Sequence, residues 1–407
     1  MAQDGDMILE GLKVVDAASF LAGPCAATIM SDYGADVIKI EPLTGDRHRT
    51  ISGGHPIDHS WQLTGRNKRS LALNIAVEAG RDVLLKLVAD ADVLVVNFRP
   101  DQLAKYRLTF EELHAHNPRL VVAQVSGYGN DGADAGQPAF DMTGWWARTG
   151  ILDMVHDKGV APAPGAGGVG DHATAMTLFG AIMLALYRRD KTGEGSFVHT
   201  SLATAGAWAN GLNLHAVMTG VDIAARRDIE GWSNPFSNVY ETRDGRYLLL
   251  SVQNMKRDWP KLAAALGHSE WLEDERFATV RTLFRNRREA GECIAAGFMD
   301  LDLADALARL LDAGIVHSVI ARNAEVVEDQ QLIDNGLIVP TDETEPGYDR
   351  ALATPIRIDG VSQRTPSRAP TIGQHSAEIL AEHGYDAAAA AELTAAGVVG
   401  QVADGSV

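Results

Sequence analysis

Two short apolar runs, rich in valine, restrict the fold more than any other feature of the chain. Asp92 to Phe98 is almost continuously apolar, and Leu120 to Ser126 repeats the pattern. Such runs are typical of strands that are buried on both faces of a parallel sheet. Shortly before them, Glu78 to Ala89 carries valine and leucine on one helical face. This alternation of strands and helices predicts βαβ units and a mostly parallel sheet, that is, an α/β fold.

The same patterns extend the expected order of elements to about residue 220. Further strands are expected at 12–17, 36–40, 71–75 and 196–201, and further helices at 23–34, 172–189 and 203–218. A loop rich in glycine, proline and alanine at 157–170 precedes the long helix.

The character of the sequence changes near residue 225. Val239 to Val252 indicates a hairpin that turns at Asp244-Gly245. Amphipathic helices are expected at 256–266, 286–298 and 303–313, and a last helix at 375–383 before an alanine-rich tail. Residues 1–224 therefore form the first part of a large domain, residues 225–335 a smaller α+β domain, and residues 336–407 a third segment.

Composition excludes several classes of partner. The 407-residue chain has a formal net charge of −18, which argues against nucleic acid or an anionic membrane surface. Its two cysteines are too few for a disulfide framework and fit a reducing compartment. The first six residues are acidic and lack the apolar segment of a signal peptide, so we expect none, and the uncharged run after residue 171 is shorter than the roughly 20 residues of a membrane span. We expect a cytoplasmic protein.

Asp171 stands between a stretch of glycines and a helix that lacks charge. Gly165 to Gly170 precede it, and from Ala173 to Tyr187 the only ionisable side chain is that of Tyr187. A carboxylate at the start of an apolar helix, preceded by glycines that have no side chains, is accessible to a large substrate. Such a position suits a nucleophile. The simpler interpretation is a helix N-cap, which contributes about 1 kcal/mol. Position alone favours the cap.

The glycines also match the spacing of a dinucleotide-binding fingerprint, Gly165-x-Gly167-x-x-Gly170. A strand should precede that fingerprint, but Ala161 to Pro164 alternates alanine with proline. The acidic residue about twenty positions later, Asp190, falls on the same helix instead of on a second strand. A nicotinamide cofactor is therefore disfavoured.

A local excess of positive charge lies within this acidic chain. Residues 39–69 contain six lysines and arginines against three acids. Arg99 follows the predicted strand at 92–98, at the carboxyl edge where open α/β sheets bind ligands. The stretch is either a solvated basic face or part of a site for a phosphate-bearing ligand.

No motif indicates a metal site. His55 and His59 are separated by Pro56, so they do not form a helical pair of metal ligands. The motifs C-x-x-C and H-E-x-x-H are absent, as are the P-loop and G-x-S-x-G.

Seven short blocks are spread along the chain: Gly11 to Asp16, Ala22 to Pro24, Gly34 to Glu41, Asn67 to Ser70, Val96 to Pro100, Gly170-Asp171, and Lys191 to Gly195. Together they resemble the class III coenzyme A transferases, the CaiB/BaiF family that includes formyl-CoA transferase and carnitine-CoA transferase. The likeness covers essentially the whole chain and is strongest over 9–202.

The resemblance implies a Rossmann-like large domain built from both chain ends, with the smaller domain inserted. Residues 336–407 would then be the C-terminal return to the large domain. It also implies a homodimer of two ring-shaped subunits that are interlocked like chain links.

The resemblance further implies a mechanism in which an aspartate attacks the thioester of a donor acyl-CoA. A mixed anhydride forms, the released CoA thiolate converts it into an aspartyl-CoA thioester, and an acceptor carboxylic acid then takes the CoA. Asp171 matches that aspartate, and glycine N–H groups near it would stabilise the oxyanion. Coenzyme A is a substrate here, and no permanently bound cofactor is implied.

The positions that match the family's CoA contacts are Lys68, Asn97 and Arg99. Ala22 falls on the loop that lines the thioester. The lysine of formyl-CoA transferase near residues 138–141 is replaced by proline here.

The fold that the resemblance implies is shared by the 2-methylacyl-CoA racemases. Their acid/base pair needs a histidine, which lies in a Gly-His-Asp block. Here the block is Ala139-Phe140-Asp141, and phenylalanine cannot move a proton. A CoA transferase is therefore the first expectation, a racemase the second and a nicotinamide oxidoreductase the third. A catalytically silent CoA-binding protein is a further alternative, which the intact Gly170-Asp171 block disfavours.

Overall fold

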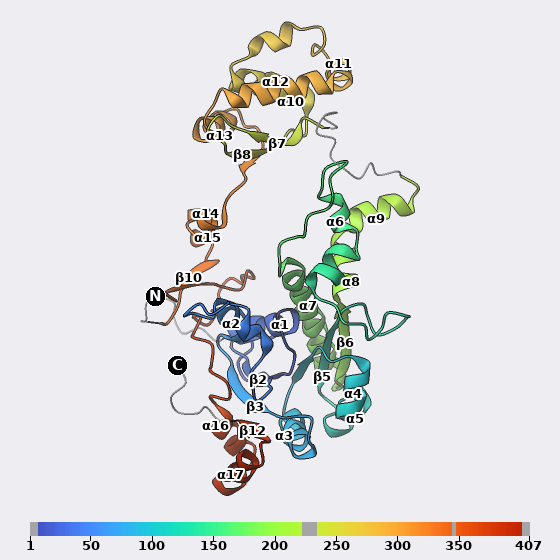
Figure 1. Cartoon of the computed structure of the whole chain (residues 1–407), viewed down its shortest axis with the longest axis vertical. Helices are drawn as coiled ribbons and strands as arrows, with labels where there is room; N and C mark the ends of the chain where they lie inside the picture. The colour runs from blue at the N-terminus through green and yellow to red at the C-terminus, as the bar shows by residue number, and fades with distance from the viewer. Residues whose placement is uncertain (1–6, 222–233, 344–346, 401–407) are drawn as a thin grey trace. The chain divides into compact units, whose positions relative to one another are not determined.

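The computed structural model describes residues 7–221, 234–343 and 347–400 (Figure 1). The chain divides into two compact units. Unit 1 comprises Met1–Leu152, Pro164–Ile223 and Gln330–Val407, and unit 2 comprises Asp153–Ala163 and Ala224–Asp329. Residues 153–163, which the sequence assigned to the large domain, thus group with unit 2. The domain boundaries at 225 and 336 stay predictions.

A seven-stranded sheet forms the centre of unit 1. Its strands are β1 (Lys13–Asp16), β2 (Asp36–Glu41), β3 (Arg69–Leu73), β4 (Val93–Val96), β5 (Val121–Ser126), β6 (Ser196–Ser201) and β12 (Val399–Gly400). They lie in the order β12-β3-β2-β1-β4-β5-β6, and all neighbours are parallel except β12 and β3. Apart from β12 this is the doubly wound order, in which the direction of winding reverses between β1 and β4. The predicted α/β fold with a mostly parallel sheet is confirmed.

Helices cover both faces of this sheet, as the apolar runs predicted. Along β1, Val14 belongs to one apolar core and Val15 to the other. The first core includes α1 (Ala22–Asp32) and α7 (Val169–Thr192), and Figure 1 shows α7 beside β5 and β6. The second includes α3 (Glu78–Ala89), α5 (Phe110–His116) and α16 (Ser376–Glu382). Because both faces are covered, the ends of the strands are left for a site.

Unit 2 has its own apolar core beside a small antiparallel sheet, β7 (Ser237–Glu241), β8 (Tyr247–Ser251) and β9 (His317–Val319). The predicted hairpin is confirmed, since β7 pairs antiparallel with β8 around a turn in which Gly245 has φ of +70°. The predicted helices are also confirmed, as α10 (Met255–Leu266), α12 (Arg287–Met299) and α13 (Leu303–Asp312).

Shorter elements connect these parts. They are η1 (Arg47–Thr50), η3 (Ser269–Glu273), the π-helical turn η2 (Asp141–Ala147), β10 (Ile338–Pro340), β11 (Arg350–Leu352), α2 (His59–Gly65), α4 (Pro100–Tyr106), α6 (Ile151–Met154), α8 (Leu202–Ala209), α9 (Gly211–Met218), α11 (Val280–Arg285), α14 (Asn323–Val326), α15 (Gln330–Asp334) and α17 (Ala387–Ala395).

Two sequence predictions need correction. The single helix expected at 203–218 is divided into α8 and α9, because Asn210 leaves the helical path and its side chain donates to the Thr149 carbonyl at 2.9 Å. The long helix begins at Val169, three residues before the expected start. This second difference changes the position of Asp171 in the helix.

Candidate active site

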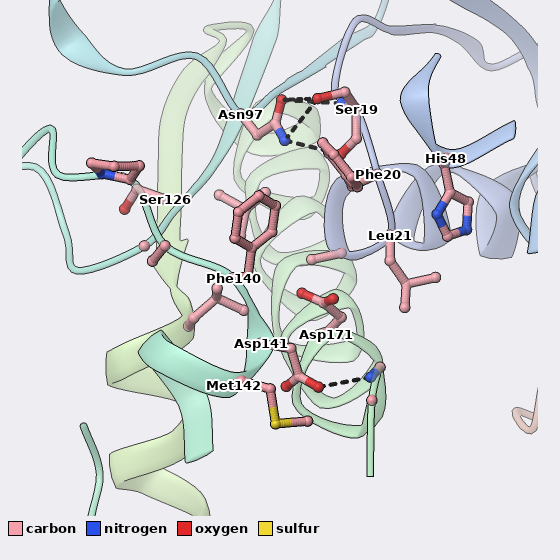
Figure 2. Close-up of a pocket in the computed structure, with 18 of the residues that line it drawn as sticks. Ser19, Phe20, Leu21, His48, Asn97, Ser126, Phe140, Asp141, Met142 and Asp171 are labelled. Carbon is pink, nitrogen blue, oxygen red and sulfur yellow. Dashed lines mark hydrogen bonds between the residues drawn. The ribbon is translucent and has the colours of Figure 1, made fainter. Parts of the chain in front are cut away.

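A pocket of about 790 Å³ lies at the carboxyl edge of the sheet in unit 1. Its lining includes the segments after β1 and β4 and the end of β5, namely Ser19 to Ala22, Asn97 to Pro100, and Ser126 to Gly127. Since winding reverses between β1 and β4, the connections after these strands diverge and leave a crevice, which is where doubly wound sheets bind their ligands. Asp171 lines the same pocket from α7 (Figure 2).

Asp171 lies in the first turn of α7, three residues after the N-cap. The N-cap is Gly168, whose φ of +83° is a left-handed conformation that favours glycine. The interpretation of Asp171 as the N-cap is therefore wrong. Within the described residues no hydrogen bond reaches its half-buried carboxylate, so the carboxylate is available to a ligand in the pocket.

Asp141 also lines the pocket, and sequence reasoning did not single it out as a site residue. It begins η2, and its Oδ2 accepts a hydrogen bond from the Gly168 N–H at 2.7 Å, so it takes the capping role that the simpler interpretation gave to Asp171. Its Oδ1 is buried and has no hydrogen-bond partner. The sequence signal was present in the block Ala139-Phe140-Asp141, where only the missing histidine drew attention.

The glycine before Asp171 is required by close packing of α7 against η2. A Cβ at Gly170 would lie 2.2 Å from Asp141 Oδ1 and 2.3 Å from Trp145 Cγ. Both distances are far below van der Waals contact. Gly170 therefore brings the backbone of α7, and Asp171 with it, next to the Asp141 carboxylate.

The two carboxyl groups hold their protons differently. Burial, with a further contribution from the charge of Asp141, raises the pKa of Asp171 to about 7. Burial also raises the pKa of Asp141, but the N–H of Gly168 opposes that shift by stabilising its charged form. Within the described residues no such donor reaches the Asp171 carboxylate, and a difference in surroundings of this kind is typical of carboxyl pairs with different roles.

Three of the predicted ligand contacts line the pocket together with Asp171: Ala22, Asn97 and Arg99. Ala22 is the first residue of α1. The Asn97 amide holds the segment after β1, since it donates to the Ser19 carbonyl at 2.9 Å and accepts from the Ser19 N–H at 3.0 Å. Arg99 has 42% of its side chain exposed and pairs with Asp101 at 3.2 Å.

Lys68 does not line the pocket. Its ammonium is fully buried, 2.8 Å from Asp16 Oδ2 and 2.8 Å from the Pro24 carbonyl. Burial lowers the pKa of Lys68, while the charge of Asp16 opposes the shift. In this structure Lys68 joins β1 to α1, so its predicted CoA contact has no support from its position.

The basic stretch at 39–69 likewise folds inward onto acids. Its salt bridges are Lys39–Asp46, Arg49–Glu41, Arg66–Asp32, Lys68–Asp16 and Arg69–Asp36. Most of the local positive charge is therefore neutralised within the fold. Arg99, from a different part of the chain, is the cation that faces the pocket among the described lining residues.

Helix α7 also has the length and composition of a membrane span, the one such helix among the described residues. Its residues Ala175, Leu178 and Ile182 belong to the apolar core of unit 1, as in the core helix of a globular protein. In the same described ranges no group of three or more His, Cys, Asp or Glu side chains could hold a metal ion.

Comparison with known proteins connects this site to a family. The sequence profile described as CoA-transferase family III matches residues 9–376. The chain is 29% identical to the (R)-2-hydroxy-4-methylpentanoate CoA-transferase of Clostridioides difficile, over 93% of this chain and 96% of that protein. It is 30% identical to the cinnamoyl-CoA:phenyllactate CoA-transferase of Clostridium sporogenes, over 93% and 94% respectively. Its fold is similar to that of a CAIB/BAIF family protein from Brucella suis, with a TM-score of 0.82 and 29% identity over 93% of this chain and 100% of that chain. The protein therefore belongs to CoA-transferase family III and is an enzyme of the CoA-transferase class.

Proposed function

We propose that this enzyme moves CoA from an acyl-CoA to a carboxylic acid through covalent intermediates on Asp171. The observation that carries the proposal is the position of the Asp171 carboxylate, which lines the pocket at the first turn of α7 without a hydrogen bond from the described residues. Gly167 and Gly168 line the pocket beside it and leave space for a thioester. A carboxylate nucleophile divides one difficult acyl transfer into easier steps.

Each step exchanges one bond at a carbonyl carbon. A carboxylate oxygen of Asp171 attacks the donor thioester, the C–S bond breaks, and CoA leaves as the thiolate. The thiolate then attacks the Asp171 carbonyl of the mixed anhydride and releases the donor acid as a carboxylate. The acceptor carboxylate next attacks the aspartyl-CoA thioester and again releases the thiolate. Attack of the thiolate on the acceptor acyl carbon gives the new acyl-CoA and regenerates the Asp171 carboxylate.

The N-terminus of α1 supplies the electrostatic support for these steps. The first N–H groups of a helix have no partner within it, and the helix dipole places positive potential there. Ala22 begins α1 and lines the pocket, so its end of the helix would stabilise the oxyanion. Of the glycine N–H groups near Asp171 that were expected to stabilise the oxyanion, that of Gly168 donates to Asp141 instead. Arg99 would bind a CoA phosphate at the mouth.

Mass spectrometry tests the covalent intermediate. Incubation with a substrate acyl-CoA should add a CoA or acyl mass to a peptide that contains Asp171, and hydroxylamine should convert the adduct to a hydroxamate. The same incubation of Asp171→Ala is the control. Active transfer without any adduct on Asp171, or equal labelling of the variant, would contradict the proposal.

Transfer should depend on pH through the ionisation of Asp171. Only the carboxylate is nucleophilic, and burial raises its pKa to about 7, so kcat/KM should rise as pH increases through 7 and then reach a plateau. Asp141→Asn removes the neighbouring negative charge and should move the midpoint to lower pH. A profile that is flat from pH 5 to pH 9 in the wild type would show that another group limits the reaction.

We further propose 2-hydroxy acids with apolar side chains as the substrate class. The pocket wall contains Ile51, Leu63, Phe140 and Met142. By their names, the two bacterial relatives act on 2-hydroxy-4-methylpentanoate and on phenyllactate, which are branched and aromatic 2-hydroxy acids. The apolar wall of this pocket would accommodate such side chains.

Proton abstraction from a 2-methylacyl-CoA is not favoured. Phe140 stands in the place of the required histidine and packs edge-on against Phe20, with ring centroids 5.4 Å apart. Within the pocket it acts as an apolar wall.

We also propose a cytoplasmic, interlocked homodimer. Leu184 and Tyr187 on α7, Trp208 on α8, and Leu212 and Met218 on α9 are strongly exposed, with 87% for Trp208 and 85% for Leu212. Large apolar side chains gathered on neighbouring helices are typical of an interface. We expect Trp208→Glu with Leu212→Glu to lower the fraction of dimer that assembles when the unfolded chain is refolded, as measured by sedimentation, whereas Lys105→Glu, a control on α4, should leave that fraction unchanged. Linked rings cannot separate without unfolding, so rapid exchange between tagged and untagged native dimers would exclude the interlocked form.

A further inference from the structure

The imidazole of His48 is almost fully buried and lies near the Ser60 backbone, yet it makes no hydrogen bond of normal geometry. His48 lies in η1, is 6% exposed, and lines the pocket that contains Asp171 (Figure 2). By distance and angle, neither Nδ1 nor Nε2 makes a hydrogen bond. Buried polar side chains are paired in the large majority of cases, so an unpaired ring in a pocket wall indicates a partner that the ligand supplies.

The backbone around His48 is held firmly, so the position of the ring is part of the fold. Asp46 caps η1 by accepting a hydrogen bond from the His48 N–H at 2.9 Å. The same carboxylate accepts from the Phe20 N–H at 3.3 Å and lies 3.3 Å from the buried Lys39 ammonium. Asp46 thereby connects η1 to Phe20, which also lines the pocket.

An uncharged imidazole at His48 favours an uncharged hydrogen-bonding group on the ligand. Burial lowers the pKa of His48, so the ring is uncharged at neutral pH and offers one N–H donor and one acceptor nitrogen. A hydroxyl group can both donate and accept, whereas a second carboxylate would need a cation. The neighbouring lining residues Ile51 and Leu63 are apolar and would accommodate a hydrocarbon side chain next to that hydroxyl.

We propose that His48 binds the 2-hydroxyl group of the acyl substrate and thereby selects 2-hydroxy acids over their deoxy analogues. This inference rests on the proposed function, because it assumes that the acyl group is held in the pocket beside Asp171. His48 is a specificity-determining residue in this scheme and takes no part in the bond exchanges.

A comparison of two donors in three enzymes tests the inference. The donors are 2-hydroxy-4-methylpentanoyl-CoA and 4-methylpentanoyl-CoA, which differ only in the hydroxyl, and the acceptor acid is kept the same. The enzymes are the wild type, His48→Phe, which keeps a ring but removes both nitrogens, and His48→Gln, which keeps a donor and an acceptor. The measurement is the ratio of kcat/KM for the two donors.

We expect the wild type to prefer the hydroxylated donor by roughly 10- to 100-fold, the usual effect of a hydrogen bond whose loss leaves a buried group unpaired. His48→Phe should reduce the ratio to about one, and His48→Gln should retain part of it. Calorimetric binding of free CoA and the melting temperature establish that each variant is folded.

The outcomes separate this inference from the function on which it rests. A ratio in His48→Phe that equals that of the wild type would overturn the role of His48. A variant that loses activity with both donors in equal measure would also overturn it, because the contact would then be to CoA or to the fold. Equal use of both donors by the wild type would reject the inference while leaving CoA transfer intact. Absence of the Asp171 adduct with every donor would reject the proposed function itself.

Discussion

Asp171→Asn is expected to reduce CoA transfer by roughly 10³- to 10⁵-fold, the scale on which loss of a covalent nucleophile acts. The amide has nearly the shape of the carboxyl group but cannot attack a thioester, so affinity for free CoA should persist in calorimetry. Transfer at a rate near that of the wild type would reject Asp171 as the nucleophile.

The same variant should be more stable than the wild type above neutral pH. Because burial raises the pKa of Asp171 from its ordinary 3.8 to about 7, the charged form is disfavoured in the folded protein, and this loss of stability develops as pH rises from about 4 to about 7. The amide in the variant carries no charge, so we expect the free energy of unfolding to rise by ~1–3 kcal/mol at pH 8, and little change at pH 4. Denaturant unfolding at the two pH values measures both effects.

Lys68→Met is expected to lower the stability of the fold, whereas Arg99→Met is expected to weaken binding of the acyl-CoA. Removing the buried ammonium of Lys68 leaves the Asp16 carboxylate with the Ala18 N–H and with the more distant ammonium of Lys39, 3.8 Å away, so Lys68→Met should destabilise the protein by about 3 kcal/mol. Arg99 is partly exposed and faces the pocket, so Arg99→Met should change stability by less than about 0.5 kcal/mol. It should instead raise KM for the acyl-CoA by roughly 10- to 100-fold.

Salt provides an independent check on these two cations. Screening weakens exposed charge pairs, so KM of the wild type should rise with ionic strength, and the rise should be smaller in Arg99→Met. If Lys68→Met were fully stable and showed the raised KM, Lys68 would bind CoA as the sequence first suggested. Unchanged KM in both variants would mean that CoA phosphates are bound elsewhere.

The sheet could be predicted because the strand signal is local. The apolar runs at 92–98 and 120–126 need only neighbouring residues to be recognised, and both became central strands. β12 could not be predicted, since two residues carry no periodicity and pair with β3 only because the tertiary fold brings them there. The break at Asn210 depends in the same way on a distant partner, the Thr149 carbonyl.

The position of Asp171 in the pocket was predictable, but the electrostatics of the site were less so. Asp171 was found from its glycines and from the family resemblance, and it lines the pocket. Asp141 and His48 were missed, because a carboxylate that caps a distant helix and a buried unpaired ring leave no local pattern. The excess charge at 39–69 suggested a phosphate site, but a net charge along the sequence does not show which cations face acids across the fold.

The pairing of β12 with β3 has a consequence for how the protein folds during synthesis. Leu73 meets Val399, so the outer edge of β3 stays open until nearly all of the described chain has left the ribosome. Strands β1 to β5 can associate long before that, and their unpaired edge is able to join an edge of another nascent chain. The pairing of β12 with β3 closes a very long loop, which is entropically costly and slow, so this pairing should be among the last to form. Truncation before residue 399 should therefore lower the yield of soluble protein more than it lowers the activity of the protein that does fold.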